Sequence, residues 1–202
     1  MNKLRLFIVE DQALLLSALT TLLGQEPDFE IVGTAADGEQ AKKALAGVSP
    51  HVVLTDIEMP IIDGITLTDH ISTDHPDCKT IILTTFARTG YLQRVLKAGA
   101  AGYLLKDKNT EYLVDAIRRV AAGETVVAPE LAVSHWVDQD PLTDREREIL
   151  VQIESGATTA EISNTIHLSE GTVRNYLSEA ISKLNAKNRV DAARIARKQG
   201  WL

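Results

Sequence analysis

The first 125 residues alternate between two kinds of segment, and no other feature of the chain restricts its fold as much. Five short apolar runs, rich in β-branched residues, are separated by longer segments with helical periodicity. The apolar runs lie at residues 4–9, 29–34, 51–55, 80–84 and 102–105, and the helical segments lie near 12–23, 37–46, 64–74, 89–98 and 110–122. This alternation predicts an α/β fold with a doubly wound, five-stranded parallel sheet covered by helices on both faces.

The pattern changes after residue 123. Residues 124–140 include a proline and end in the acidic run Asp138-Gln139-Asp140, which is typical of a linker with room for one short helix. From Pro141 onward the periodicity is helical throughout, and helices are predicted near 143–154, 158–166, 169–184 and 188–199. The predicted domains are therefore an α/β domain at 1–123, a linker at 124–140 and an all-α, four-helix domain at 141–202.

The net charge of −7 conceals an uneven distribution. Residues 1–125 carry a net charge of −5 and residues 126–140 a net charge of −3, whereas residues 141–202 carry +1. Within that last part, residues 171–202 hold 7 basic and 2 acidic side chains. The basic end of the chain is compatible with nucleic-acid binding, and the acidic remainder is not.

The cysteine count and the lengths of the apolar runs indicate the cellular compartment. Cys78 is the single cysteine, so no intramolecular disulfide can form and nothing indicates an oxidising compartment. The apolar run Leu6–Val9 is too short for a signal peptide, and no stretch approaches the ~18 apolar residues of a membrane span. These features predict a cytoplasmic protein with no membrane partner.

Chemically active side chains are predicted to gather at one edge of the sheet. The carboxyl ends of parallel strands meet at one edge, and ligands bind there near a switch in strand order. The residues at these strand ends are Glu10 and Asp11, Asp56, Thr84, and Lys106. Each of them alone is more often a turn former, a helix cap or a surface side chain. The interpretation depends on their falling at successive strand ends.

Three carboxylates in one place repel one another unless a cation joins them, and oxygen ligands favour Mg²⁺. A carboxylate beside such a cation can attack a phosphoryl group and form an aspartyl-phosphate. Lys106 can pair with the new charge, and Thr84 can donate a hydrogen bond to a phosphoryl oxygen. The sequence therefore predicts Mg²⁺-dependent phosphoryl chemistry at this edge.

Residues 1–125 resemble the receiver domain of bacterial two-component response regulators, which has a CheY/flavodoxin-like fold. The resemblance is carried by Phe7–Asp11, Thr55–Pro60 with Asp63-Gly64, Ile82–Thr85 and Lys97–Lys106. It implies that Asp56 is the phosphoacceptor and that Asp11 binds Mg²⁺ directly, Glu10 through water. Glu58 would contribute its backbone carbonyl to the metal.

The same resemblance assigns switch residues. Thr84 and Lys106 would sense the phosphoryl group, and Tyr103 would be the aromatic switch residue. The chain departs from many receivers at Asp107, which stands where they have a proline after the sensing lysine.

The C-terminal domain contains a predicted helix-turn-helix within residues 158–184. Apolar positions at helical spacing predict a shared core of Ile162, Ile166, Val173, Leu177, Ile181 and Leu184. The other face of the second helix carries Arg174, Asn175 and Ser178, which can read base edges in the major groove. Predicted phosphate contacts are Thr172, Lys183 and Arg189. From spacing alone, a helical bundle with a solvated polar face is an equal alternative.

This domain resembles the output domain of the NarL/FixJ (LuxR-type) regulators through Leu142–Leu150, Ala160–Ile162, Gly171–Tyr176 and Asn188–Ala192. It departs at Ser178, where a basic residue is often found. Further local features, Glu10–Gln12, Thr84–Arg88 and Gly200-Trp201, resemble a Gram-positive, desaturase-regulating (DesR-like) subgroup.

Together the resemblances imply a phosphorylation-dependent transcription regulator and not an enzyme. A sensor histidine kinase would phosphorylate Asp56, with slow autodephosphorylation as the reverse process. Phosphorylation would promote a homodimer that binds double-stranded promoter DNA, and RNA polymerase is a further candidate partner.

Three alternatives remain at this point. A phosphohydrolase with an aspartyl nucleophile is disfavoured, because Asp56 follows the third strand and Glu58 replaces the expected second aspartate. A protein-interaction adaptor would use the helical domain without touching DNA. A regulator that binds DNA independently of phosphate is disfavoured by the complete acidic site.

Overall fold

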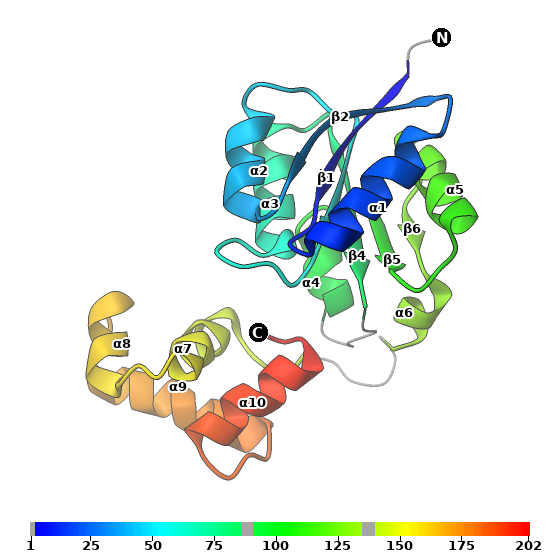
Figure 1. Ribbon diagram of the computed structural model, residues 1–202. Helices are drawn as coiled ribbons and strands as arrows, with labels where there is room; N and C mark the ends of the chain where they lie inside the picture. Colours follow the sequence, from blue (N-terminus) through cyan, green and yellow to red (C-terminus); the bar gives the residue numbers. More distant parts are fainter. Residues whose placement is uncertain (1–2, 86–90, 135–139) are drawn as a thin grey trace. The chain divides into compact units, whose positions relative to one another are not determined.

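The computed structural model describes residues 3–85, 91–134 and 140–202, which form two compact units that divide near residue 133 (Figure 1). The first unit is an α/β unit and the second is helical, so the predicted fold class is confirmed for both parts. In the part of the chain that is described, no helix has the length and apolar character needed to cross a membrane.

The first unit is built on a parallel sheet. Its strands are β1 (Leu4–Val9), β2 (Phe29–Ala35), β3 (Val52–Asp56), β4 (Lys79–Thr84), β5 (Gly102–Leu105) and β6 (Val126–Val127). Their order across the sheet is β2-β1-β3-β4-β5-β6, and each neighbouring pair is parallel. The order reverses direction between β1 and β3, which places the switch point beside these two strands.

The described helices of this unit are α1 (Ala13–Gly24), α2 (Gly38–Leu45), α3 (Gly64–Asp74), α4 (Tyr91–Lys97), α5 (Thr110–Ala121) and α6 (Pro129–Ser134). Residues 89–90 of the predicted fourth helix lie outside the described part of the chain. Figure 1 shows α1 and α5 on one face of the sheet, with α2 and α3 on the other.

The strands are buried on both faces because successive side chains point in opposite directions. Along β1, Leu6 and Ile8 join the core beneath α1 and α5, whereas Phe7 and Val9 join the core beneath α2 and α3. This is the burial that near-continuous apolar strands predict.

The sheet has one strand more than the five predicted. In β6, Val126 and Val127 pair with Gly102 and Tyr103 of β5. The adjacent α6 is fastened to this unit as well, because Leu131 is buried and Lys108 pairs with Glu130. The first half of the predicted linker therefore adds an edge strand and a helix to the sheet. Two valines form no period that a sequence pattern can reveal, so the strand depends on its pairing with β5.

The second unit contains α7 (Asp144–Glu154), α8 (Thr159–Thr165), α9 (Glu170–Lys183) and α10 (Arg189–Gln199). The helices begin near the predicted positions. Thr143 and Thr158 each form a capping box at the starts of α7 and α8, and the Ser169 side chain caps α9. The predicted apolar positions of α8 and α9 pack in one core with α7 and α10. The predicted four-helix domain with a helix-turn-helix is confirmed.

Candidate functional site

Three carboxylates meet at the carboxyl edge of the sheet. Glu10 and Asp11 follow β1, and Asp56 ends β3, the neighbouring strand across the switch point. One oxygen from each carboxylate lies within 4.8 Å of the other two. Glu10 and Asp56 are buried, whereas Asp11 is exposed at the mouth of the cluster. The sheet therefore brings these predicted residues together with one side open to solvent.

Lys106 closes the cluster from the end of β5. Its ammonium nitrogen lies 2.8 Å from Oε2 of Glu10 and 2.8 Å from Oδ2 of Asp56, and its side chain is 7% exposed. Thr84, at the end of β4, is buried, and its carbonyl oxygen accepts a hydrogen bond of 2.8 Å from the backbone N–H of Lys106. The hydroxyl and the ammonium that the sequence predicts at this edge are thus held by adjacent strands.

The electrostatic balance of the cluster is incomplete. Burial raises the pKa of Asp56 and of Glu10, and the hydrogen bonds and charge of Lys106 offset this only in part. Burial also works to lower the pKa of Lys106, but its bonds to the two carboxylates outweigh burial and raise it. One ammonium therefore serves two buried carboxylates, with Asp11 as a third acid nearby. Added positive charge would relieve the excess, so the donor set fits an oxygen-binding divalent cation such as Mg²⁺.

The backbone around Asp56 is tightly packed. The N–H of Ile57 donates a hydrogen bond of 2.7 Å to Oδ1 of Asp56, and the N–H of Gly64 donates to the carbonyl of Ile57 at 2.9 Å. A β-carbon on Gly64 would lie 1.8 Å from the carbonyl oxygen of Asp56. The receiver resemblance includes Gly64 but implies no role for it. Its position as the first residue of a helix, directly after the capping Asp63, is a further local signal.

Glu58 and Tyr103 are the two other residues predicted for this site. The side chain of Glu58 is exposed in the segment after β3. Tyr103 is fully buried, at 0% exposure. Its neighbour Leu104 joins the core beneath α1 and α5, so strand alternation directs Tyr103 to the opposite face of the sheet. Residues 86–88 of the Thr84–Arg88 motif lie outside the described residues.

The second unit presents a polar face along α9. Arg174, Asn175 and Ser178 are exposed, and Arg174 is held at 3.1 Å from Glu170, one turn earlier. The Ser178 hydroxyl donates a hydrogen bond to the carbonyl of Arg174. Because serine is short, the helix surface has no long side chain at this position. Thr172 is half-buried at the start of the helix, where its hydroxyl lies 2.8 Å from that of Ser169.

The two remaining predicted DNA contacts differ from each other. Arg189 is exposed at the start of α10. Lys183, at the end of α9, is exposed as well, but its ammonium nitrogen lies 2.7 Å from Oε2 of the buried Glu146. A basic residue of the predicted DNA surface thus pairs with an acid of its own unit.

Comparison with known proteins identifies both units. Residues 6–118 match the response regulator receiver domain, and residues 140–196 match the luxR family of bacterial regulatory proteins. The transcriptional regulatory protein YvfU of Bacillus subtilis is 49% identical over 199 residues, which cover 98% of this chain and 100% of that protein. DesR of the same organism is 44% identical over 196 residues, covering 97% and 98%. The predicted similarity to DesR is confirmed, and the similarity extends to YvfU.

Solved structures agree with the fold. The response regulator ChrA of a heme-sensing two-component system is 32% identical with a TM-score of 0.59, and each chain covers 100% of the other. The response regulator RcsB, solved in a complex with DNA, has the same fold at 24% identity, with a TM-score of 0.67 and coverage of 98% and 99%. The chain belongs to the two-component response regulators that join a receiver domain to a LuxR-type DNA-binding domain, and it is a transcriptional regulator.

Proposed function

We propose that Asp56 accepts a phosphoryl group from a sensor histidine kinase and that this controls DNA binding by the helical unit. The observation that carries the proposal is the buried Asp56–Lys106–Glu10 cluster, which opens to solvent beside Asp11. In the reaction, a carboxylate oxygen of Asp56 forms a bond to phosphorus as the bond between phosphorus and the histidine nitrogen breaks. The nitrogen leaves with the electron pair.

Glu10, Asp11 and Asp56, with the backbone carbonyl of Glu58, would hold Mg²⁺, which supplies the positive charge that phosphoryl transfer requires. Lys106 would turn from the Asp56 carboxylate to the new phosphoryl oxygens, and the Thr84 hydroxyl would donate to one of them. The phosphorylated aspartate carries about −1.5 to −2 charge, which gives Lys106 a stronger partner than it has before.

Repacking of Thr84 and Tyr103 would favour a state that forms a homodimer. Two LuxR-type units then bind paired half-sites on double-stranded promoter DNA, because the symmetry of a helix-turn-helix dimer mirrors that of its site. Arg174 and Asn175 are the proposed base contacts, and Thr172 and Arg189 the proposed phosphate contacts. Ser178 would lie beside the bases and contribute little, since its hydroxyl is committed to the helix backbone.

The proposal includes three further features. We assign residues 1–123 to the receiver, 124–140 to the linker and 141–202 to the DNA-binding domain, with β6 and α6 of the linker attached to the receiver sheet. Slow loss of the phosphoryl group to water would be the only turnover. The protein would work in the cytoplasm, where a kinase, promoter DNA and RNA polymerase are accessible.

The test is a binding selection from genomic fragments with full-length protein and Mg²⁺, with and without beryllofluoride as a phosphoryl mimic. We expect a few fragments to be enriched only with the mimic, and enrichment to be lost in Asp56→Ala. Asp69→Ala, an exposed aspartate of α3, is the matched control and should behave as wild type. Equal enrichment without the mimic would refute phosphate control, and no enrichment in either condition would favour the adaptor alternative.

A further inference from the structure

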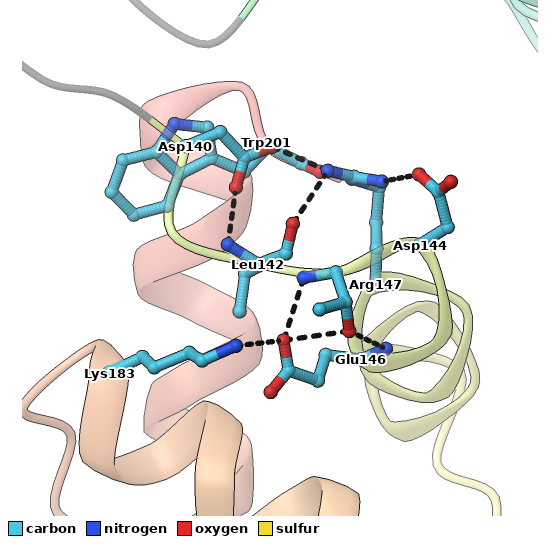
Figure 2. Close-up of polar contacts among 8 residues, drawn as sticks. Asp140, Leu142, Asp144, Glu146, Arg147, Lys183 and Trp201 are labelled. Carbon is cyan, nitrogen blue, oxygen red and sulfur yellow. Dashed lines mark hydrogen bonds and ion pairs between the residues drawn. The ribbon is translucent and has the colours of Figure 1, made fainter.

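At the end of helix α9, an exposed lysine forms an ion pair with a buried carboxylate of α7. Glu146 lies in the first turn of α7 and is 0% exposed, whereas Lys183 is the last residue of α9. Their charged groups are 2.7 Å apart (Figure 2). The pair therefore joins the start of one helix to the end of the helix that carries Arg174 and Asn175.

The carboxylate is also bound on its own helix. Oε2 of Glu146 accepts hydrogen bonds from the N–H of Thr143 at 2.7 Å and from the Thr143 hydroxyl at 2.9 Å. These bonds hold the carboxylate at the N-terminus of α7 independently of Lys183. Burial works to raise the pKa of Glu146, but its bonds with Lys183 and Thr143 outweigh burial and lower it. The partner of Lys183 is therefore an ionised carboxylate whose orientation is fixed by Thr143.

The core contacts of α9 are apolar along the whole helix. They are made by Val173, Leu177 and Ala180, with Leu184 directly after the last helical residue. Apolar contacts are not directional, so they tolerate a rotation of the helix about its axis that would displace exposed side chains. A charge-assisted bond between two positioned groups restricts that rotation.

We propose that Glu146 and Lys183 are positioning residues for DNA recognition. Glu146, through Lys183, sets the orientation of α9 at which Arg174 and Asn175 reach base edges, and Lys183 is not a phosphate contact. This inference rests on the proposed DNA binding by α9. It assigns to a buried carboxylate, which cannot touch DNA, an effect on sequence discrimination.

Glu146→Gln separates the two roles of Lys183. The variant keeps the shape of the side chain, and glutamine can accept the capping bond of Thr143. If Lys183 contacted phosphate, removing the buried acid would leave that contact in place or strengthen it. If the pair positions α9, the variant loses sequence-specific affinity although the protein has one negative charge less.

The measurement uses full-length protein with beryllofluoride, a fragment that wild type enriches, and a mixed-sequence duplex of equal length. We expect the affinity ratio between fragment and duplex to fall at least about fivefold in Glu146→Gln, the loss equivalent to one mismatched base pair. The slope of log affinity against log salt on the mixed duplex should stay unchanged in Lys183→Met, because no phosphate contact is lost. In Arg189→Met that slope should become shallower by about 0.9.

Matched variants complete the design. Glu148→Gln changes an exposed glutamate two residues away in α7 and should leave the affinity ratio unchanged. Lys183→Arg keeps the cation and should retain most of the affinity ratio of the wild type. Glu146→Gln combined with Lys183→Met should lose no more than the worse single variant, because the two residues act as one unit.

The failures are distinguishable. If wild type enriches no fragment, the proposed DNA binding is wrong and the inference falls with it. If wild type enriches fragments but Glu146→Gln keeps the full affinity ratio, or Lys183→Met reduces the salt slope by about 0.9, only the positioning role is refuted. Thermal unfolding of each variant, measured separately, identifies any variant that fails to fold. If Glu146→Gln does not fold, the affinity ratio of Lys183→Arg and the salt slope of Lys183→Met test the positioning role.

Discussion

The carbonyl oxygen of Asp56 lies so close to Gly64 that a β-carbon on the glycine would stand 1.8 Å from it. Real atoms do not approach to that distance, so any larger residue must displace either the start of α3 or the end of β3. The end of β3 carries the proposed phosphoacceptor. The first helical turn of α3 thus limits the backbone position of Asp56.

Gly64→Ala should therefore destabilise the receiver unit by about 3 kcal/mol or more and slow phosphorylation in the molecules that remain folded. Chemical denaturation and phosphorylation by a small-molecule donor measure the two effects. Gly47→Ala is the matched control, because its β-carbon would make only an ordinary contact of 3.7 Å with Ala44. The control should change stability by less than about 1 kcal/mol. Equal behaviour of the two variants would contradict the close approach as the cause.

Asp56→Asn should stabilise the metal-free protein at neutral pH. Burial raises the pKa of Asp56 in the folded state, so ionisation costs the folded protein about 1.4 kcal/mol for each pKa unit of the shift. The stability linked to this group is complete below the unfolded pKa of about 3.9 and is lost as pH rises through the folded value. The advantage of the asparagine variant should therefore grow from about pH 4 to pH 7.

Thermal unfolding in a chelator across this pH range measures the difference. Asp69→Asn, in which the aspartate is exposed, is the control and should show no such trend. A gain from Asp56→Asn that is independent of pH would show that the effect comes from packing and not from ionisation.

Arg174→Ala should remove sequence discrimination with little effect on folding. The side chain is 63% exposed and, among the described residues, pairs with Glu170 on the same helix, an exposed pair that adds little stability. Loss of a base contact should cost about 1 to 3 kcal/mol on a specific fragment. Binding to the fragments recovered in the selection, compared with Ser182→Ala at another exposed position of α9, measures the loss. Unaltered specific binding would move the base contacts away from this face.

Replacement of Arg147 by methionine should destabilise the helical unit much more than replacement of Arg145. Arg147 is 19% exposed, and its guanidinium binds the carbonyl of Trp201 at 2.7 Å, the Asp140 carboxylate at 2.6 Å and Asp144 at 2.7 Å (Figure 2). Its loss leaves the mostly buried Asp140 carboxylate without its cation and should cost about 2 to 4 kcal/mol.

Arg145 lies in the same helical turn, and its partner among the described residues is the exposed Glu148, so its replacement should cost less than about 1 kcal/mol. Denaturant unfolding of the two variants gives both values. Similar losses would mean that the network around Arg147 adds nothing to the stability of the helical unit.

The sequence predicts those parts of the structure that local rules determine. The five apolar strands and the four C-terminal helices lie close to the predicted ranges, because local patterns such as the capping boxes at Thr143 and Thr158 specify them. Glu10, Asp11, Asp56, Thr84 and Lys106 were predicted to meet because parallel topology forces strand ends onto one edge. Their roles follow from chemistry and resemblance, and remain predictions that the experiments above test.

The features that were not predicted depend on contacts between distant segments. Nothing in the sequence distinguishes Lys183 from a phosphate contact, and only the fold places Glu146, 37 residues earlier, against it. The closeness of Gly64 to Asp56 likewise depends on how the start of α3 packs against the end of β3.

The sixth strand determines where this receiver can be cut and joined to other proteins. A truncation after residue 123 would remove Val126 and Val127 and leave β5 as an open edge, which in solution invites pairing with a second chain. It would also discard Leu131 and the Lys108–Glu130 pair. A chimera that gives this receiver a new output should therefore retain residues through Ser134, the end of α6. All six strands are parallel, so β6 ends at the same edge of the sheet as β3, which carries Asp56, although β4 and β5 lie between them.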